Sequence, residues 1–192
     1  MTLRLALIAG LALGPLSLPG QDAKPDALPA MAMPKPGPEM AKLAFMVGTW
    51  HVVDIHEPGF MGPGGKGHGT GTVSLGPGGL SLLIDYKAAA GPMKTYRGHG
   101  VTLWDGEAKV YKQVWVDNMA PMLMTSSGNW EGGTIVMNAE GMMMGKAFKS
   151  RDTISGMSKD GYTITTEMSL DGSPMNKVMT LVHTRVKASP AK

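Results

Sequence analysis

Closely spaced turn signals constrain the fold of this chain more than any other feature of its sequence. From about residue 49 onward, apolar and polar side chains alternate with a period of two, and short glycine-containing segments such as GPGG, DG and KDG interrupt the alternation. This pattern is typical of β-strands joined by tight turns. The predicted strands lie near residues 49–56, 67–75, 80–87, 95–104, 109–117, 122–130, 134–138, 147–155, 162–169 and 176–186.

About ten consecutive strands without crossover helices predict an all-β fold, an antiparallel up-and-down barrel. Closure into a barrel removes the exposed edge strands. One short N-terminal helix is expected before the first strand, because Pro38 and Glu39 suit a first helical turn and Gly48 suits its end. The apolar stripe of this helix is formed by Met40, Leu43, Ala44 and Val47.

The first residues are typical of a secretory signal. Arg4 precedes an apolar run from Leu5 to Leu13, and small residues near Gly20 or Ala23 suit cleavage. The apolar run is too short for a membrane anchor, which needs about 20 residues. We therefore expect a signal peptide at 1–20, a flexible lead-in at 21–36, a single β-barrel domain at 37–187 and a tail at 188–192. The expected location is secreted or periplasmic.

Composition narrows the functional classes. The 192 residues carry a net charge of +3 without a basic run, so nucleic acid is not an expected partner. The chain has no cysteine, which excludes disulfides, thiolate metal sites, cysteine nucleophiles and a lipoprotein anchor. No later segment is long and apolar enough to span a membrane. Known catalytic motifs are also missing, which favours a role other than catalysis.

The segment VYKQVWVDNMAPMLMTSSGNW, at 110–130, contains the most informative strand pair. If Asp105 pairs with Ala108 across a two-residue turn, Gly98 lies opposite Trp115 and Tyr96 opposite Asp117. Glycines opposite bulky side chains make room for them. We expect this aromatic and polar face to point into the barrel, since the other face carries valines, lysines and arginine.

Two interpretations of that face remain open. It either fills a packed barrel, with Asp117 capping a turn, or lines a cavity that binds a small hydrophobic molecule without catalysis. In the second case the predicted apolar lining is Trp50, Tyr96, Tyr111, Trp115, Met122 and Met124. The polar end of the ligand is then oriented by Gln113, Asp117 and Arg151. Neither the ligand nor the oligomeric state follows from the sequence.

Four segments occur in the order of a known pattern: PKPGPEMAKLAFMVGTW, GHGVTLWD, VYKQVWVDNM and SRDTI. Over roughly residues 34–187, the chain resembles a bacterial domain family of unknown function with the motifs G-T-W and Y-x-x-x-W-x-D-[SN]-M. That family is similar to the lipocalin-like and nitrobindin-like (calycin) β-barrels. The resemblance implies a cup for a small apolar or planar ligand. The family motif falls on Gly48, Trp50, Gly98, Gly100, Trp104, Asp105, Tyr111, Trp115, Asp117 and Met119.

The resemblance also raises haem as a cofactor. Nitrobindin-like barrels bind haem through a histidine just before the last strand, but the corresponding segment here, DGSPMNKVM, has none. The nearest is His183, where the family more often has tyrosine. This departure argues against haem, and no other cofactor is identified.

The sequence is compatible with two further functions. A copper-handling protein would use the 18 methionines, clustered as MAM, MLM and MMM, with His56 and His68 meeting across the first hairpin. His51 and His56 cannot share a metal, because they lie on opposite strand faces. An enzyme would use Asp117 as a general base. Three other carboxylates lie on predicted strands, but the sequence does not indicate that any two of them form a catalytic pair: Asp54, Asp85 and Glu167.

Overall fold

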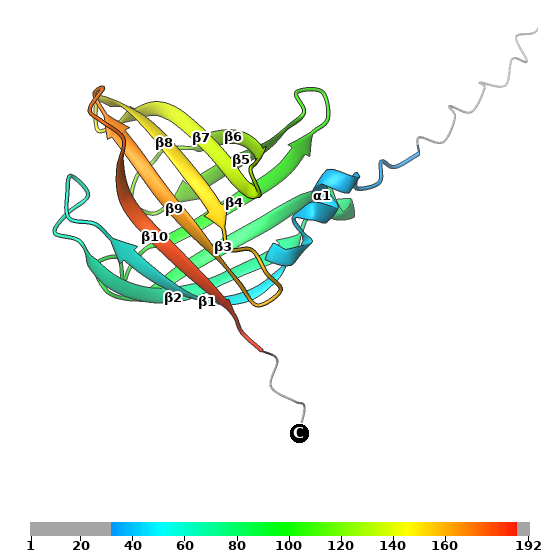
Figure 1. The fold of residues 1–192 in the computed structure, drawn as a ribbon, viewed down its shortest axis with the longest axis horizontal. Helices are drawn as coiled ribbons and strands as arrows, with labels where there is room; N and C mark the ends of the chain where they lie inside the picture. Colours follow the sequence, from blue (N-terminus) through cyan, green and yellow to red (C-terminus); the bar gives the residue numbers. More distant parts are fainter. Residues whose placement is uncertain (1–31, 188–192) are drawn as a thin grey trace, which may run out of the picture. The chain divides into compact units, whose positions relative to one another are not determined.

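Residues 32–187 are described by a computed structural model in which ten antiparallel strands close into a barrel (Figure 1). Each strand pairs with its neighbours in the sequence, and the last strand pairs with the first. The strands are β1 (Gly48–His56), β2 (Gly65–Leu75), β3 (Ser81–Ala90), β4 (Arg97–Asp105), β5 (Val110–Asp117), β6 (Met124–Glu131), β7 (Thr134–Met143), β8 (Lys146–Ser155), β9 (Gly161–Leu170) and β10 (Asn176–Arg185). The predicted all-β up-and-down barrel with one short helix is confirmed.

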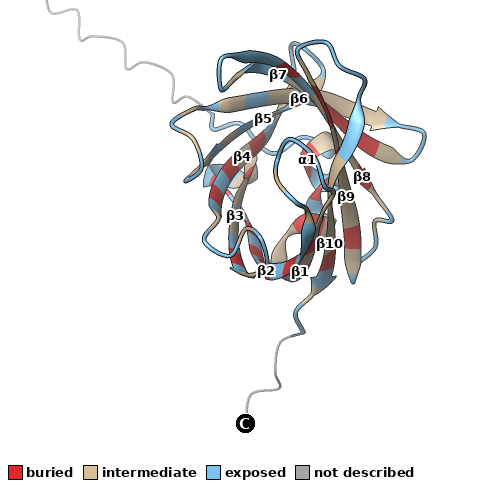
Figure 2. Cartoon of the chain, turned by 90° about the vertical axis from the view of Figure 1, so that its left-hand side faces the viewer, coloured by how far each residue is buried: buried red, intermediate tan, exposed pale blue. Residues whose placement is uncertain are grey.

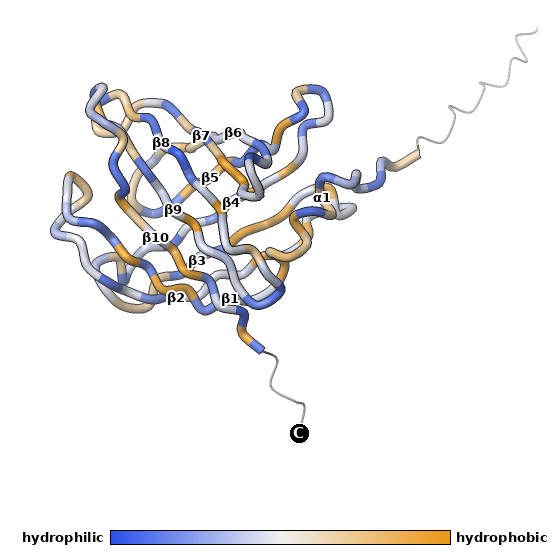
Figure 3. Tube along the Cα trace, viewed as in Figure 1, coloured by the Kyte–Doolittle hydropathy of each residue, from blue (hydrophilic) through white to orange (hydrophobic). Residues whose placement is uncertain are grey.

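The predicted signal peptide, most of the lead-in and the C-terminal tail lie outside the described residues. Within residues 32–187, the structure contains no helix with the length and hydrophobicity needed to cross a membrane. Burial alternates along the strands, while the loops are mostly exposed (Figure 2). Hydropathy alternates in the same way along the chain, as the changes of colour in Figure 3 show.

The N-terminal helix is shorter than predicted. It is split into α1 (Pro38–Lys42) and a 3-10 turn, η1 (Ala44–Met46). This break rotates the buried stripe, so that Met40, Leu43 and Met46 are buried while Ala44 is exposed. The segment packs on the apolar residues at one end of the barrel interior. A helix of five residues is not stable by itself, so its conformation depends on this packing.

Side chains of the barrel hold this segment by hydrogen bonds. The Trp50 indole N–H donates to the carbonyl of Met46 at 2.8 Å, and the Tyr111 hydroxyl donates to the carbonyl of Glu39 at 2.9 Å. The Arg185 guanidinium donates to the carbonyl of Val47 at 2.7 Å and lies 4.0 Å over the Trp50 ring. One end of the barrel is therefore closed by α1 and η1.

The register of the β4–β5 hairpin differs from the predicted one by two residues. Asp105 pairs with Val110, Gly100 with Trp115 and Gly98 with Asp117. The turn is longer because Asp105 accepts hydrogen bonds from the backbone N–H groups of Glu107 and Ala108, and Lys109 adopts a φ of 55°. A slip of two residues preserves the alternation, so the predicted inner face of this hairpin agrees with the structure.

β7 continues to Met143, beyond residue 138, where the predicted strand ended. The turn lies instead at Met144 and Gly145, both with positive φ. Gly141 belongs to the strand and lies opposite Phe148. A Cβ at Gly141 would come within 3.0 Å of the Phe148 ring, so this glycine serves close packing and not a turn.

Candidate functional site

The interior of the barrel has two different halves. Beneath α1, inward-facing side chains such as Trp50 and Tyr111 are essentially inaccessible, at 0% and 1% exposure. Toward the opposite end, Gln113, Trp115 and Met124 also lie on the inner face, yet they are only half-buried. The inner face of β5 and β6 is therefore less tightly covered at this end than the inner face beneath α1.

The predicted lining residues separate along this division. Tyr96, Gln113, Trp115, Asp117 and Met124 lie together on β5, β6 and the residue before β4, and the half-buried Met122 lies in the preceding loop. Trp50 and Tyr111 belong to the packed core beneath α1, where their hydrogen bonds hold the helical segment. They therefore stabilise the closed end and do not line accessible space.

Arg151 does not point inward. On β8 the buried or half-buried residues Phe148, Asp152 and Ile154 face the interior, and Arg151 alternates with them. Its guanidinium is exposed and lies 3.7 Å from the Glu131 carboxylate on the outer surface. The prediction that Arg151 orients a ligand beside Asp117 is corrected, because strand alternation places the two side chains on opposite faces.

A hydrogen-bonded cluster connects Tyr96, Trp115 and Asp117. The Trp115 indole N–H donates to the Tyr96 hydroxyl at 2.8 Å, and that hydroxyl donates to Asp117 Oδ2 at 3.2 Å. Asp117 Oδ1 accepts the backbone N–H of Met119 at 2.8 Å. Both oxygens of Asp117 are thus engaged, so a general-base role would require the Tyr96 hydroxyl to release it.

Glycines create the space for this cluster. The Trp115 ring lies directly over Gly98 and Gly100, where a Cβ at either position would collide with it. The φ angles of both residues lie outside the left-handed range, so close approach and not backbone conformation explains them.

A second polar cluster was not recognised from the sequence. Asp54 and His56 share the inner face of β1, and Asp54 Oδ2 lies 3.6 Å from His56 Nε2. The Tyr86 hydroxyl of β3 donates to the same Oδ2 at 3.4 Å. β2 lies between these strands and carries glycines at every inner position from Gly67 to Gly71. Because these glycines have no side chains, residues of β1 and β3 can meet over β2. The glycine repeat is the feature of the sequence that could have indicated this contact.

The two clusters form one wall. The rings of Tyr86 and Tyr96 lie with centroids 6.0 Å apart at 47°, which joins the Asp54 side to the Trp115 side. We refer to Asp54, His56, Tyr86, Tyr96, Trp115 and Asp117 as the interior cup. Burial and the neighbouring carboxylates Asp54 and Asp117 raise the pKa values of Tyr86 and Tyr96, so both hydroxyls stay protonated donors at neutral pH.

The rim around the cup is rich in methionine. In an up-and-down barrel, hairpin loops alternate between the two ends, so the loops after β1, β3, β5, β7 and β9 lie away from α1. Each of these loops contains a methionine: Met61, Met93, Met119, Met144 and Met175. All except the half-buried Met93 are exposed. Adaptable thioether side chains of this kind suit contact with an apolar molecule.

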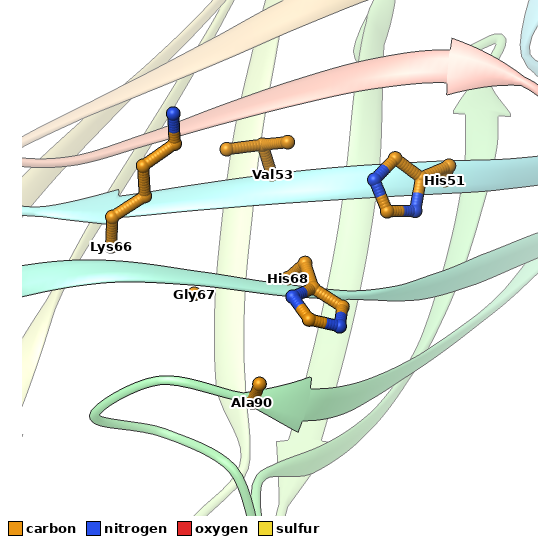
Figure 4. A pocket seen from close by; sticks show the side chains of 6 residues that line it. All are labelled: His51, Val53, Lys66, Gly67, His68 and Ala90. Carbon is orange, nitrogen blue, oxygen red and sulfur yellow. The ribbon is translucent and has the colours of Figure 1, made fainter.

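The predicted meeting of His56 and His68 does not occur. His56 faces the interior beside Asp54, whereas His68 is exposed on the outer surface of β2. There it lies beside His51, with ring centroids 5.9 Å apart, in an outer pocket of about 490 Å³ that Lys66 also lines (Figure 4). Within residues 32–187, no group of three or more histidine and acidic side chains is placed to hold a metal ion.

His183 does not fit the role of a haem ligand. The residue is 8% exposed, and its ring stacks on Tyr162 at a centroid distance of 4.1 Å, with the Trp50 ring at 6.4 Å. A haem at this ring would have to displace the packed core beneath α1. Burial lowers the pKa of His183 to about 4.

The buried His183 makes stability pH-dependent. Because the pKa is about 4 in the folded chain and about 6.5 when unfolded, the unfolded chain binds the proton first as pH falls. Stability is then complete above pH 6.5 and falls by about 3 kcal/mol toward pH 4. Urea unfolding of wild type and His183→Phe across this range measures the effect. The variant keeps the stacking ring and is expected to lose this part of the pH dependence.

Asp152 also contributes to the pH dependence of stability, so the effect of His183 is measured as the difference between wild type and His183→Phe. Burial raises its pKa, and its carboxylate accepts a hydrogen bond from Thr166 at 2.6 Å. A raised carboxyl pKa favours the folded chain as pH falls, which opposes His183. An identical slope of stability against pH in wild type and His183→Phe would contradict the assignment.

A solved structure of another protein has a similar architecture. The fold is similar to the crystal structure of Rv2717c from M. tuberculosis, with a TM-score of 0.55 and 13% identity over 80% of this chain and 100% of that one. An S-type phycobiliprotein lyase, CPES, from Guillardia theta gives a TM-score of 0.49 at 10% identity, over 78% of this chain and 93% of that one. No curated protein matches the sequence. A family profile matches residues 35–185, and the chain therefore belongs to the family described as "Protein of unknown function (DUF1579)".

Proposed function

We propose that this protein binds a small, partly apolar molecule in the interior cup and does not transform it. The observation that carries the proposal is the half-buried state of Trp115, Gln113 and Asp117 on the inner face of β5. A large indole that faces the inside of a closed barrel and is only half-buried presents apolar surface that a small molecule could cover.

Three features support this role. The cup combines aromatic rings with a few polar atoms, which is typical of small-molecule sites. The methionines of the rim provide an adaptable apolar entrance. The hydrogen bonds of Trp115 and Tyr96 fix the wall before a ligand arrives, which lowers the entropic cost of binding.

Native mass spectrometry of the protein purified from its own cells tests the proposal. We expect a stoichiometric small molecule that is released on denaturation. Trp115→Ala is expected to abolish its retention, because the largest apolar surface of the cup is removed while the core beneath α1 stays intact. Val114→Ala is the matched control, since Val114 is the exposed outward neighbour on the same strand. Equal retention by both variants would disprove the cup as the site.

We also propose that the chain is exported, on the basis of the signal-like residues 1–20. The mass of the intact protein from its own cells tests this directly. Loss of about the first 20 residues and recovery outside the cytoplasm are expected. A cytoplasmic, full-length protein would contradict export but not ligand binding.

Copper handling is the second candidate, favoured by the methionines on all the loops that surround the cup. Thioethers are soft ligands that select Cu(I). A Cu(I) titration of the purified chain distinguishes the two roles. Stoichiometric copper that is lost when Met119 and Met144 are both replaced by leucine would favour this candidate. Retention of an organic molecule by the same double variant would favour the cup.

A further inference from the structure

Carboxylates outnumber lysines and arginines among the side chains that point into the barrel. Strand alternation within residues 32–187 assigns three carboxylates, Asp54, Asp117 and Asp152, to the inner face. Two basic residues share this alternation, but neither faces the interior cup. Arg185 is held by carbonyls at the closed end, and Lys146 at the rim is exposed, 3.8 Å from Asp171.

Asp54 carries an unpartnered oxygen. The residue is 1% exposed, and its Oδ1 has no hydrogen-bond partner. The adjacent His56 Nε2 also lacks a hydrogen bond, although it lies 3.6 Å from Oδ2. A buried carboxylate oxygen without a donor is costly, and native structures rarely leave one unexplained. A ligand that brings an N–H donor and a positive charge would satisfy it.

The aromatic residues beside Asp54 favour the same ligand chemistry. The Tyr86 hydroxyl donates a hydrogen bond to Asp54, and the Tyr86 ring contacts the Tyr96 ring. The Tyr96 hydroxyl in turn accepts a hydrogen bond from the Trp115 indole. Faces of tyrosine and tryptophan attract organic cations. An anion in the cup would instead be repelled by Asp54 and Asp117, and His56 is the one basic residue of the cup. A divalent metal would need more converging ligands than the described residues provide.

We propose that the ligand of the interior cup is an organic cation, a protonated amine whose nitrogen lies beside Asp54 and whose apolar part rests on Tyr86, Tyr96 and Trp115. This inference rests on the proposed binding function and specifies its ligand class. An apolar chain attached to the amine extends from Trp115 toward the methionine rim.

Three probes with the same chain and different head groups test the proposal: octylamine, octanol and octanoate. At pH 7 the first is cationic, the second neutral and the third anionic. Isothermal titration calorimetry of the full chain is expected to show octylamine binding at least about tenfold more tightly than octanol, with octanoate the weakest. The comparison needs no mutation, so it does not depend on the folding of a variant.

Asp54→Asn then locates the interaction. It is expected to weaken octylamine binding about tenfold or more and to leave octanol binding unchanged. Asp85→Asn is the matched control, because it removes the same charge from the outer face of β3, where Asp85 pairs with His99 at 2.9 Å. Equal weakening by both variants would show a general effect of net charge and would overturn the assignment to Asp54.

The outcomes separate this inference from the proposed function. If octanol and octanoate bind as tightly as octylamine, and Trp115→Ala abolishes all three, the cup binds ligands but the cation preference is wrong. If none of the probes binds and the protein from its own cells releases no molecule, the binding function fails, and the inference fails with it.

Discussion

Replacing Trp50 with alanine is expected to lower the free energy of unfolding by about 3–5 kcal/mol, the range measured for large aromatic residues in protein cores. Trp50 is completely buried and packs edge-on against Tyr162 at 4.9 Å. The Arg185 guanidinium lies over its ring, and its indole N–H donates a hydrogen bond to the carbonyl of Met46. The substitution therefore leaves a cavity and detaches the segment that closes the barrel. Urea unfolding followed by circular dichroism measures the loss.

Trp50→Phe is the control for this prediction. It retains most of the buried ring and removes the hydrogen bond to Met46, so a smaller loss of roughly 1–2 kcal/mol is expected. A loss below about 1 kcal/mol for Trp50→Ala would contradict the central position of this side chain in the core.

Replacing Gly98 with alanine is expected to destabilise the barrel by about 1–3 kcal/mol and to weaken ligand binding by at least about tenfold. A Cβ at Gly98 would occupy the position of the Trp115 indole, so the ring must move out of its hydrogen bond with Tyr96. The φ of Gly98 is compatible with alanine, and the cost therefore comes from the collision alone. Chemical unfolding measures the first effect and calorimetry with octylamine the second.

A double-mutant cycle tests the cause. In the Trp115→Ala background, Gly98→Ala is expected to cost little, because the ring that it meets is gone. Gly106→Ala is a matched control, since a Cβ at Gly106 meets no atom within 4 Å and its φ is not positive. If Gly98→Ala costs the same in both backgrounds, the contact with Trp115 is not the reason for the glycine.

Strand alternation is a local property, and the sequence therefore predicts it well. The ten strands and the inner face of the β4–β5 hairpin follow from period-two patterns and turn residues. The register was two residues off because the Asp105 side chain bonds to the backbone and lengthens the turn. That error left the face unchanged. Whether Arg151 points inward or outward depends on which alternate residues of β8 face the interior. The neighbours of Arg151 are polar, so the sequence does not show which residues these are.

By itself, the sequence determined the strand count, the up-and-down order and the placement of Trp115 and Asp117 inside the barrel, because backbone geometry forces side chains to alternate. Only the tertiary structure decided which inner residues are packed and which are accessible. The docking of α1 and η1 buries Trp50 and Tyr111 at one end, whereas Trp115 at the other end is only half-buried. The curvature of the closed sheet also brings Asp54 to Tyr86 across the glycines of β2. This contact depends on curvature that spans several strands, which local sequence patterns do not specify.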